Sequence, residues 1–147
     1  MVPYRKGHEV LGSTLIIISQ TKLIQLFLII SAMDLSIIKV ERQQGERIIL
    51  YVENNCNTWP YILFDTTYDE EGRVTNLNRH SFIFPNLDVN TGDFILIYTG
   101  NGKNNSFRNK RGTTTHALYW GLDVNIWNSS QDSALLVKVE EYKRVNV

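Results

Sequence analysis

From residue 33 onward, apolar residues recur at every second position and not at helical spacing. The clearest stretches are "RIILYVE" at 47–53, "DFILIYT" at 93–99 and "SALLVKVEEY" at 133–142, which are rich in β-branched and aromatic residues. Successive side chains of a strand point to opposite faces of a sheet, so this spacing predicts strands. The chain after residue 33 is therefore restricted to folds built from sheets.

Turn residues separate short strands throughout this region. The expected strands are 35–41, 47–53, 59–65, 81–85, 93–99, 117–121 and 133–142. About seven short strands, with no convincing long amphipathic helix among them, indicate an all-β sandwich.

Two of the expected strands are apolar on both faces. In the stretch 93–99, Phe94, Leu96 and Tyr98 alternate with Ile95 and Ile97. A strand of a two-layer sandwich usually has one polar face. We therefore expect the outer side of the central strands to be covered, and the apolar N-terminal segment is a candidate for that cover.

Residues 1–32 form an apolar N-terminal extension, and we expect the sandwich domain to span 33–147. Three interpretations of the extension stay open. The first is a secretory signal or anchor, with basic residues before "LIQLFLII". The second is a membrane span, in which Lys22 would be costly. The third is a packed or non-native segment before a true start at Met33. The first predicts an exported or surface protein, and a start at Met33 predicts a cytoplasmic one.

Composition excludes several classes of function. Lys and Arg number 15 and Asp and Glu also number 15, so no overall charge favours nucleic acid. The single Cys56 excludes an intrachain disulfide and a multi-cysteine zinc site. His8, His80 and His116 have no metal-ligand spacing. No nucleophile elbow or phosphate loop is present. We expect no metal, no cofactor and no enzymatic activity.

The stretch "ALYWGLDVNIWNSSQDSALL" at 117–136 concentrates polar and aromatic residues. Asp123 and Asn125 match an EF-hand loop, but Trp127 occupies the next ligand position, which argues against calcium. We expect a structural corner in which tryptophans pack, a glycine turns the chain, and polar side chains bond the backbone. Its signature residues are Trp120, Gly121, Trp127, Asn128 and Asp132. A ligand platform for sugars or bases is the alternative.

Several motifs follow one another in a fixed order over the second half of the chain. They are Gly92-Asp93, Thr99-Gly100-Asn101-Gly102, Tyr119-Trp120-Gly121, Trp127-Asn128 and Asp132-Ser133-Ala134-Leu135-Leu136. This order resembles the lamin tail domain of bacterial proteins, over roughly residues 34–140. Gln131 departs from the usual glycine, and the end "KVEEYKRVNV" lacks the family's last hairpin. The resemblance implies an immunoglobulin-like antiparallel β-sandwich that binds or scaffolds and carries no fixed catalytic residue.

Residues 100–116 show no periodicity and are predicted to form a long loop. The stretch contains no acidic residue. Binding residues are common on long loops that a rigid scaffold presents. The candidate partner-binding residues are Lys103, Arg108, Lys110, Arg111 and His116. A solvated, mobile loop without a partner is the alternative.

We therefore expect a non-catalytic interaction or scaffolding module whose partner is a protein. One alternative is a nucleic-acid or envelope-polymer binding module that uses residues 100–116 with an exposed aromatic. Another is a small exported enzyme with an unrecognised site. Free sheet edges are compatible with a homodimer, and membrane association is expected only through residues 1–32.

Overall fold

The computed structural model describes residues 33–43, 45–73, 75, 80–141 and 145. The chain divides into two units, Met1–Ala32 and Met33–Val147, and every described residue lies in the second. The expected N-terminal extension, and its suggested role as a cover, lie outside the described residues. Within the described part, no helix is long and apolar enough to cross a membrane.

The described residues form strands and no helix, so the predicted all-β fold is confirmed. In chain order the strands are β1 (Leu35–Glu41), β2 (Arg47–Val52), β3 (Cys56–Asn57), β4 (Tyr61–Thr67), β5 (His80–Ile83), β6 (Asp88–Val89), β7 (Phe94–Tyr98), β8 (Asn105–Arg108), β9 (Thr114–Tyr119) and β10 (Asp132–Lys138). They make a five-stranded sheet in the order β1-β2-β7-β9-β8, a three-stranded sheet in the order β10-β4-β5, and a β3-β6 pair.

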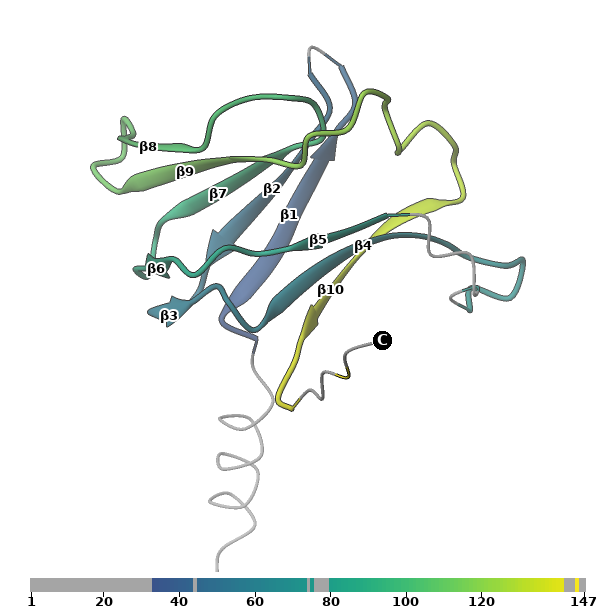
Figure 1. Ribbon diagram of the computed structural model, residues 1–147, viewed down its shortest axis with the longest axis horizontal. Coiled ribbons are helices and arrows are strands. Elements are labelled where there is room, and N and C mark those ends of the chain that lie inside the picture. Colours follow the sequence, from purple (N-terminus) through teal and green to yellow (C-terminus); the bar gives the residue numbers. More distant parts are fainter. Residues whose placement is uncertain (1–32, 44, 74, 76–79, 142–144, 146–147) are drawn as a thin grey trace, which may run out of the picture. The chain divides into compact units, whose positions relative to one another are not determined.

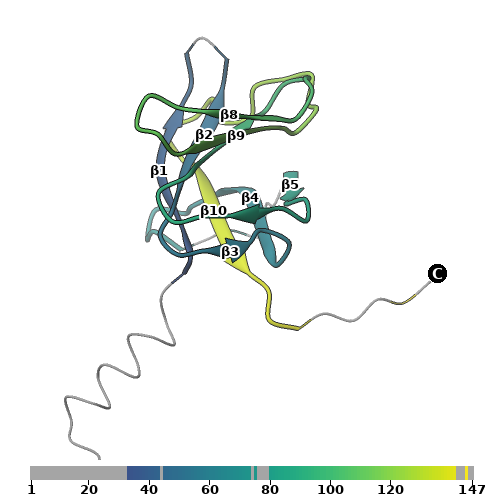
Figure 2. The same cartoon turned by 90° about the vertical axis from the view of Figure 1, so that its left-hand side faces the viewer.

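The two larger sheets form the layers of a sandwich. Strands β7, β8 and β9 lie in one layer and β4 and β5 in the other (Figures 1 and 2). Burial alternates along β2 and β7, where every second side chain is buried between the layers. The buried core residues are Leu35, Ile48, Leu50, Val52, Tyr61, Leu63, Phe82, Phe84, Val89, Ile95, Ile97, Leu118, Ile126 and Trp127.

The prediction of an irregular loop over 100–116 is wrong. Strand β8 and the start of β9 lie within it and pair antiparallel, and β9 also pairs parallel to β7. All four residues of β8 are exposed. A strand at the sheet edge with no buried face needs no alternation of apolar and polar residues, which is why periodicity missed it.

The corner between β9 and β10 packs two tryptophans. Trp127 is buried, and its ring lies edge-on to Trp120 with centroids 5.8 Å apart. Gly121 has a φ of +82°, a backbone conformation that other residues rarely adopt. The Asp132 carboxylate accepts a hydrogen bond from the Ser129 N–H at 2.7 Å, and the Asn128 amide donates to the Asn125 carbonyl at 3.3 Å.

A buried carboxylate ties this corner to the five-stranded sheet. Glu46, directly before β2, accepts hydrogen bonds from the backbone N–H groups of Ile126 at 2.7 Å and Trp127 at 3.0 Å. Its own carbonyl accepts the Thr99 N–H at 3.0 Å. Glu46 therefore connects β2, the end of β7 and the tryptophan corner.

Candidate functional site

Strands β8 and β9 form a hairpin that lies at the left-hand edge of the sandwich (Figure 1). Its turn is closed by a bond from the Gly112 N–H to the Asn109 carbonyl at 3.0 Å. The Asn109 side-chain oxygen accepts the N–H groups of Arg111 at 3.0 Å and Thr113 at 3.2 Å. Gly112 has a φ of +82°, as a three-residue hairpin loop with a glycine requires. The turn is therefore held in one conformation by its own hydrogen bonds.

Among the described strands, β8 ends the five-stranded sheet, so its backbone leaves one side of the strand open. The Asn109 N–H donates to the Thr113 carbonyl at 2.9 Å, so Asn109 and Thr113 form a hydrogen-bonded pair of the antiparallel ladder. Bonded and non-bonded pairs alternate along an antiparallel ladder. The Ser106–His116 and Arg108–Thr114 pairs are consequently non-bonded, and the Thr114 N–H indeed donates elsewhere, to Asp93 at 2.8 Å.

It follows that Ser106 and Arg108 direct their N–H and C=O groups away from β9, toward the open edge. Such unpaired groups are a template for another strand. The hairpin thus presents a short and ordered stretch of free backbone.

Four basic side chains surround this edge. Lys103, Arg108, Lys110 and Arg111 are all exposed, and none forms an ion pair with an acidic residue in the part of the chain that the structure describes. The Arg111 guanidinium lies over the Phe94 ring, 5.3 Å from its centroid. The hairpin therefore carries a local positive charge that no described neighbour neutralises.

An apolar groove of about 430 Å³ lies beside the hairpin on the outer face of the sheet. Ile49, Phe94 and Leu96 line it, together with Phe107 of β8, which is 50% exposed. Lys110 and Arg111 also line the groove. The site thus combines free backbone, positive charge and apolar surface.

His116 differs from the other predicted site residues. It lies in β9 and is buried, because β9 turns its side chain toward the space between the sheets with that of Leu118. Its Nδ1 lies 2.8 Å from the Ser106 Oγ, and its Nε2 lies 3.5 Å from the Asp93 Oδ2. The expectation that His116 contacts a partner from an exposed loop is therefore corrected.

Sequence reasoning missed Ser106, Phe107 and the groove. One local signal was available: "NSFR" and "TTTHALY" flank "NKRG", a short turn with glycine at its last position, which is a hairpin pattern. The groove could not be found in this way, because Ile49 comes from β2, far away in sequence.

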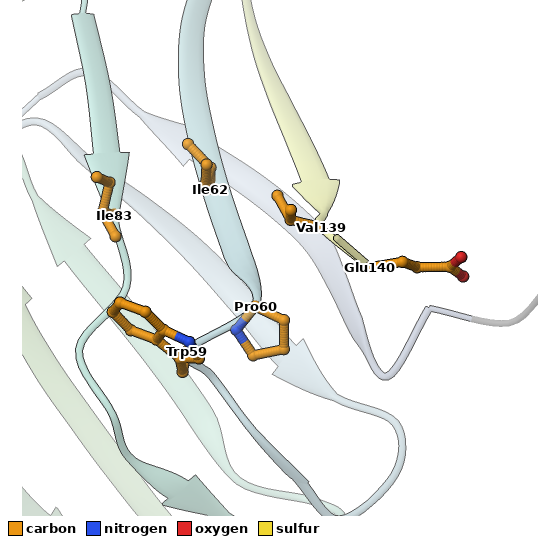
Figure 3. Close-up of a pocket in the computed structure, with 6 residues that line it drawn as sticks. All are labelled: Trp59, Pro60, Ile62, Ile83, Val139 and Glu140. Carbon is orange, nitrogen blue, oxygen red and sulfur yellow. The ribbon is translucent and has the colours of Figure 1, made fainter. Parts of the chain in front are cut away.

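A second apolar surface lies on the outer face of the three-stranded sheet. It is a pocket of about 400 Å³ between Trp59, Ile62, Ile83 and Val139. Figure 3 shows Trp59 beside Ile83, with the Glu140 carboxylate pointing away from the apolar side chains. Trp59 is 51% exposed, so it differs from the two packed tryptophans of the corner.

The described residues include no group of three or more His, Cys, Asp or Glu side chains that could hold a metal ion. Cys56 is half-buried, and burial raises the pKa of its thiol, which lowers the fraction of reactive thiolate.

Comparison of the chain with protein-family models, with curated proteins and with solved structures gave no match. The resemblance to the lamin tail domain therefore stays a prediction.

Proposed function

We propose that this protein is a non-catalytic interaction module that binds an extended, acidic segment of a partner protein along the open edge of β8. The observation that carries the proposal is the coincidence of a free strand edge with four exposed cations, Lys103, Arg108, Lys110 and Arg111.

Backbone geometry supports strand addition. Ser106 and Arg108 each offer one donor and one acceptor at the edge, by the alternation of the β8–β9 ladder. A peptide strand that pairs with β8 gains main-chain hydrogen bonds, and pockets for alternate side chains give specificity. Each bond adds a net of about 0.5–1.5 kcal/mol, so four bonds support a weak contact.

Charge and surface shape define the partner. Four cations beside the edge favour glutamate or aspartate, and the attraction steers association. Alternate residues of an added strand point to the outer face, where the groove beside Phe107 accepts an apolar side chain. The partner segment is therefore expected to alternate acidic and apolar residues.

The test uses a fluorescein-labelled peptide of alternating glutamate and valine, titrated with the protein by fluorescence anisotropy. Arg108→Pro removes the Arg108 N–H at the open edge and leaves the hydrogen bonds between β8 and β9 in place. Arg108→Ser is the matched control, because it also loses the charge but keeps the N–H. We expect Arg108→Pro to bind more weakly than Arg108→Ser. Equal affinity of these two variants would reject strand addition.

Charge is tested separately. Lys110→Glu should weaken binding by about tenfold or more, whereas Lys39→Glu, an exposed lysine on β1, should have little effect. Binding should also weaken as salt rises, because the attraction is screened. An affinity that is the same for both variants would show that the hairpin cations play no part.

A second candidate function is supported by the aromatic residues of the outer face. Tyr98 and Tyr119 stack with ring centroids 5.0 Å apart, and the Arg47 guanidinium lies over Tyr98 at 5.5 Å. Aromatic and basic side chains together bind single-stranded nucleic acid. A titration with fluorescein-labelled oligothymidylate in low salt tests this function, and no binding there would reject it.

A further inference from the structure

Three side chains with complementary chemistry come close to one another across the five-stranded sheet. They come from β8, from β9 and from the residue before β7. The Ser106 Oγ lies 2.8 Å from the His116 Nδ1, and the His116 Nε2 lies 3.5 Å from the Asp93 Oδ2. Ser106 and His116 face each other in a non-bonded pair, where side chains of neighbouring strands come closest.

The Asp93 carboxylate lies 3.5 Å from the His116 Nε2, and the two atoms form no hydrogen bond. The carboxylate accepts the N–H groups of Asn90 at 2.9 Å and Thr114 at 2.8 Å. Burial alone raises the pKa of Asp93, but these two bonds and His116 outweigh burial and hold the pKa below its usual value. The carboxylate is therefore ionised, and its negative charge favours hydrogen on the Nε2 that lies 3.5 Å away, without a hydrogen bond between them. The Nδ1 lone pair is then free to accept the Ser106 proton.

The three side chains differ in their exposure to solvent. Ser106 is exposed, whereas His116 and Asp93 are 6% and 3% exposed. The base and the acid are thus shielded from water, whereas the serine belongs to an exposed residue at the sheet edge. The Ser106 N–H points to the open strand edge, where it can donate to an oxygen that develops negative charge.

We propose that Ser106 is an activated nucleophile that takes an acyl group from activated carboxylic esters. The Ser106 Oγ forms a bond to the ester carbonyl carbon while its proton passes to the His116 Nδ1. The ester C–O bond then breaks, and the leaving alkoxide takes the proton from His116. The products are acyl-Ser106 and one alcohol. Asp93 and His116 act in the roles of the acid and base of a serine triad, with the two ring nitrogens exchanged.

The test treats the full chain with p-nitrophenyl acetate and measures acetylation of individual serines by peptide mass spectrometry. Ser130 is the internal control, because it is exposed and no histidine contacts it in the described part of the chain. General-base assistance contributes about 10²-fold or more, so Ser106 should be acetylated about 10²-fold faster than Ser130. His116→Gln should reduce the rate at Ser106 to that at Ser130.

The ratio of the two rates in the wild-type protein gives a second readout that needs no variant. Equal rates at Ser106 and Ser130 at neutral pH would overturn the proposal.

Discussion

Replacing Glu46 with alanine removes the carboxylate that accepts hydrogen bonds from two buried N–H groups, those of Ile126 and Trp127. A buried donor left without a partner costs about 1–3 kcal/mol, so two such groups give about 2–6 kcal/mol. The loop that holds them can shift and admit water. We therefore expect Glu46→Ala to lower the free energy of unfolding by about 2–4 kcal/mol, and Glu46→Gln, which keeps one acceptor oxygen, by about half as much.

Urea denaturation measures this directly, with tryptophan fluorescence and circular dichroism followed on the same samples. Coincident transitions would establish two-state unfolding, and the slope against urea should stay at its wild-type value. A loss below about 0.5 kcal/mol for Glu46→Ala, which is the range of ordinary surface changes, would refute the reasoning. Equal losses for the alanine and glutamine variants would also contradict it.

Three further predictions concern single residues. Burial of the ring raises the pKa of Tyr61 to about 12, whereas its value in the unfolded chain is about 10. The free energy of unfolding should therefore fall as pH rises from about 10 to 12. Denaturation at several pH values should show a smaller fall for Tyr61→Phe. Hydrogen bonds lower the pKa of Asp93 in the fold, so its contribution should be lost as pH falls below about 4, and Asp93→Asn should flatten acid unfolding. Gly102 lies against the Tyr119 ring, and Gly102→Ala should destabilise by about 1–3 kcal/mol in urea denaturation.

Most strands could be predicted because they have a buried face. Strands β2 and β7 place apolar residues at every second position, and this alternation is visible in any sequence. The positive-φ Gly121 and the hydrogen-bonded Asp132 mark the corner, and both come from local chemistry. Elements that are fixed by burial or by turn geometry therefore leave a pattern in the chain.

The remaining features depend on contacts that are distant in sequence. Glu46 lies in the polar stretch "QQGER", which is typical of a solvated turn, yet its carboxylate binds the backbone 80 residues away. The parallel pairing of β7 with β9 arises because β8 continues the sheet beyond β9, and no local signal encodes that order.

The candidate site was predicted in part. The four cations were identified as a basic cluster, but the irregular loop expected around them is a hairpin. His116 was grouped with them by sequence proximity, although strand geometry directs it inward. Charge can be counted from a sequence, whereas the face to which a side chain points depends on the strand register.

Hydrogen exchange at the backbone of β8 tests the central claim most directly. In the free protein, the N–H groups of Ser106 and Arg108 should exchange rapidly, and that of Phe107 should be protected by the β8–β9 ladder. Adding the glutamate–valine peptide should protect Ser106 and Arg108 and leave Phe107 unchanged. Binding of the peptide with no gain of protection at Ser106 and Arg108 would contradict the account.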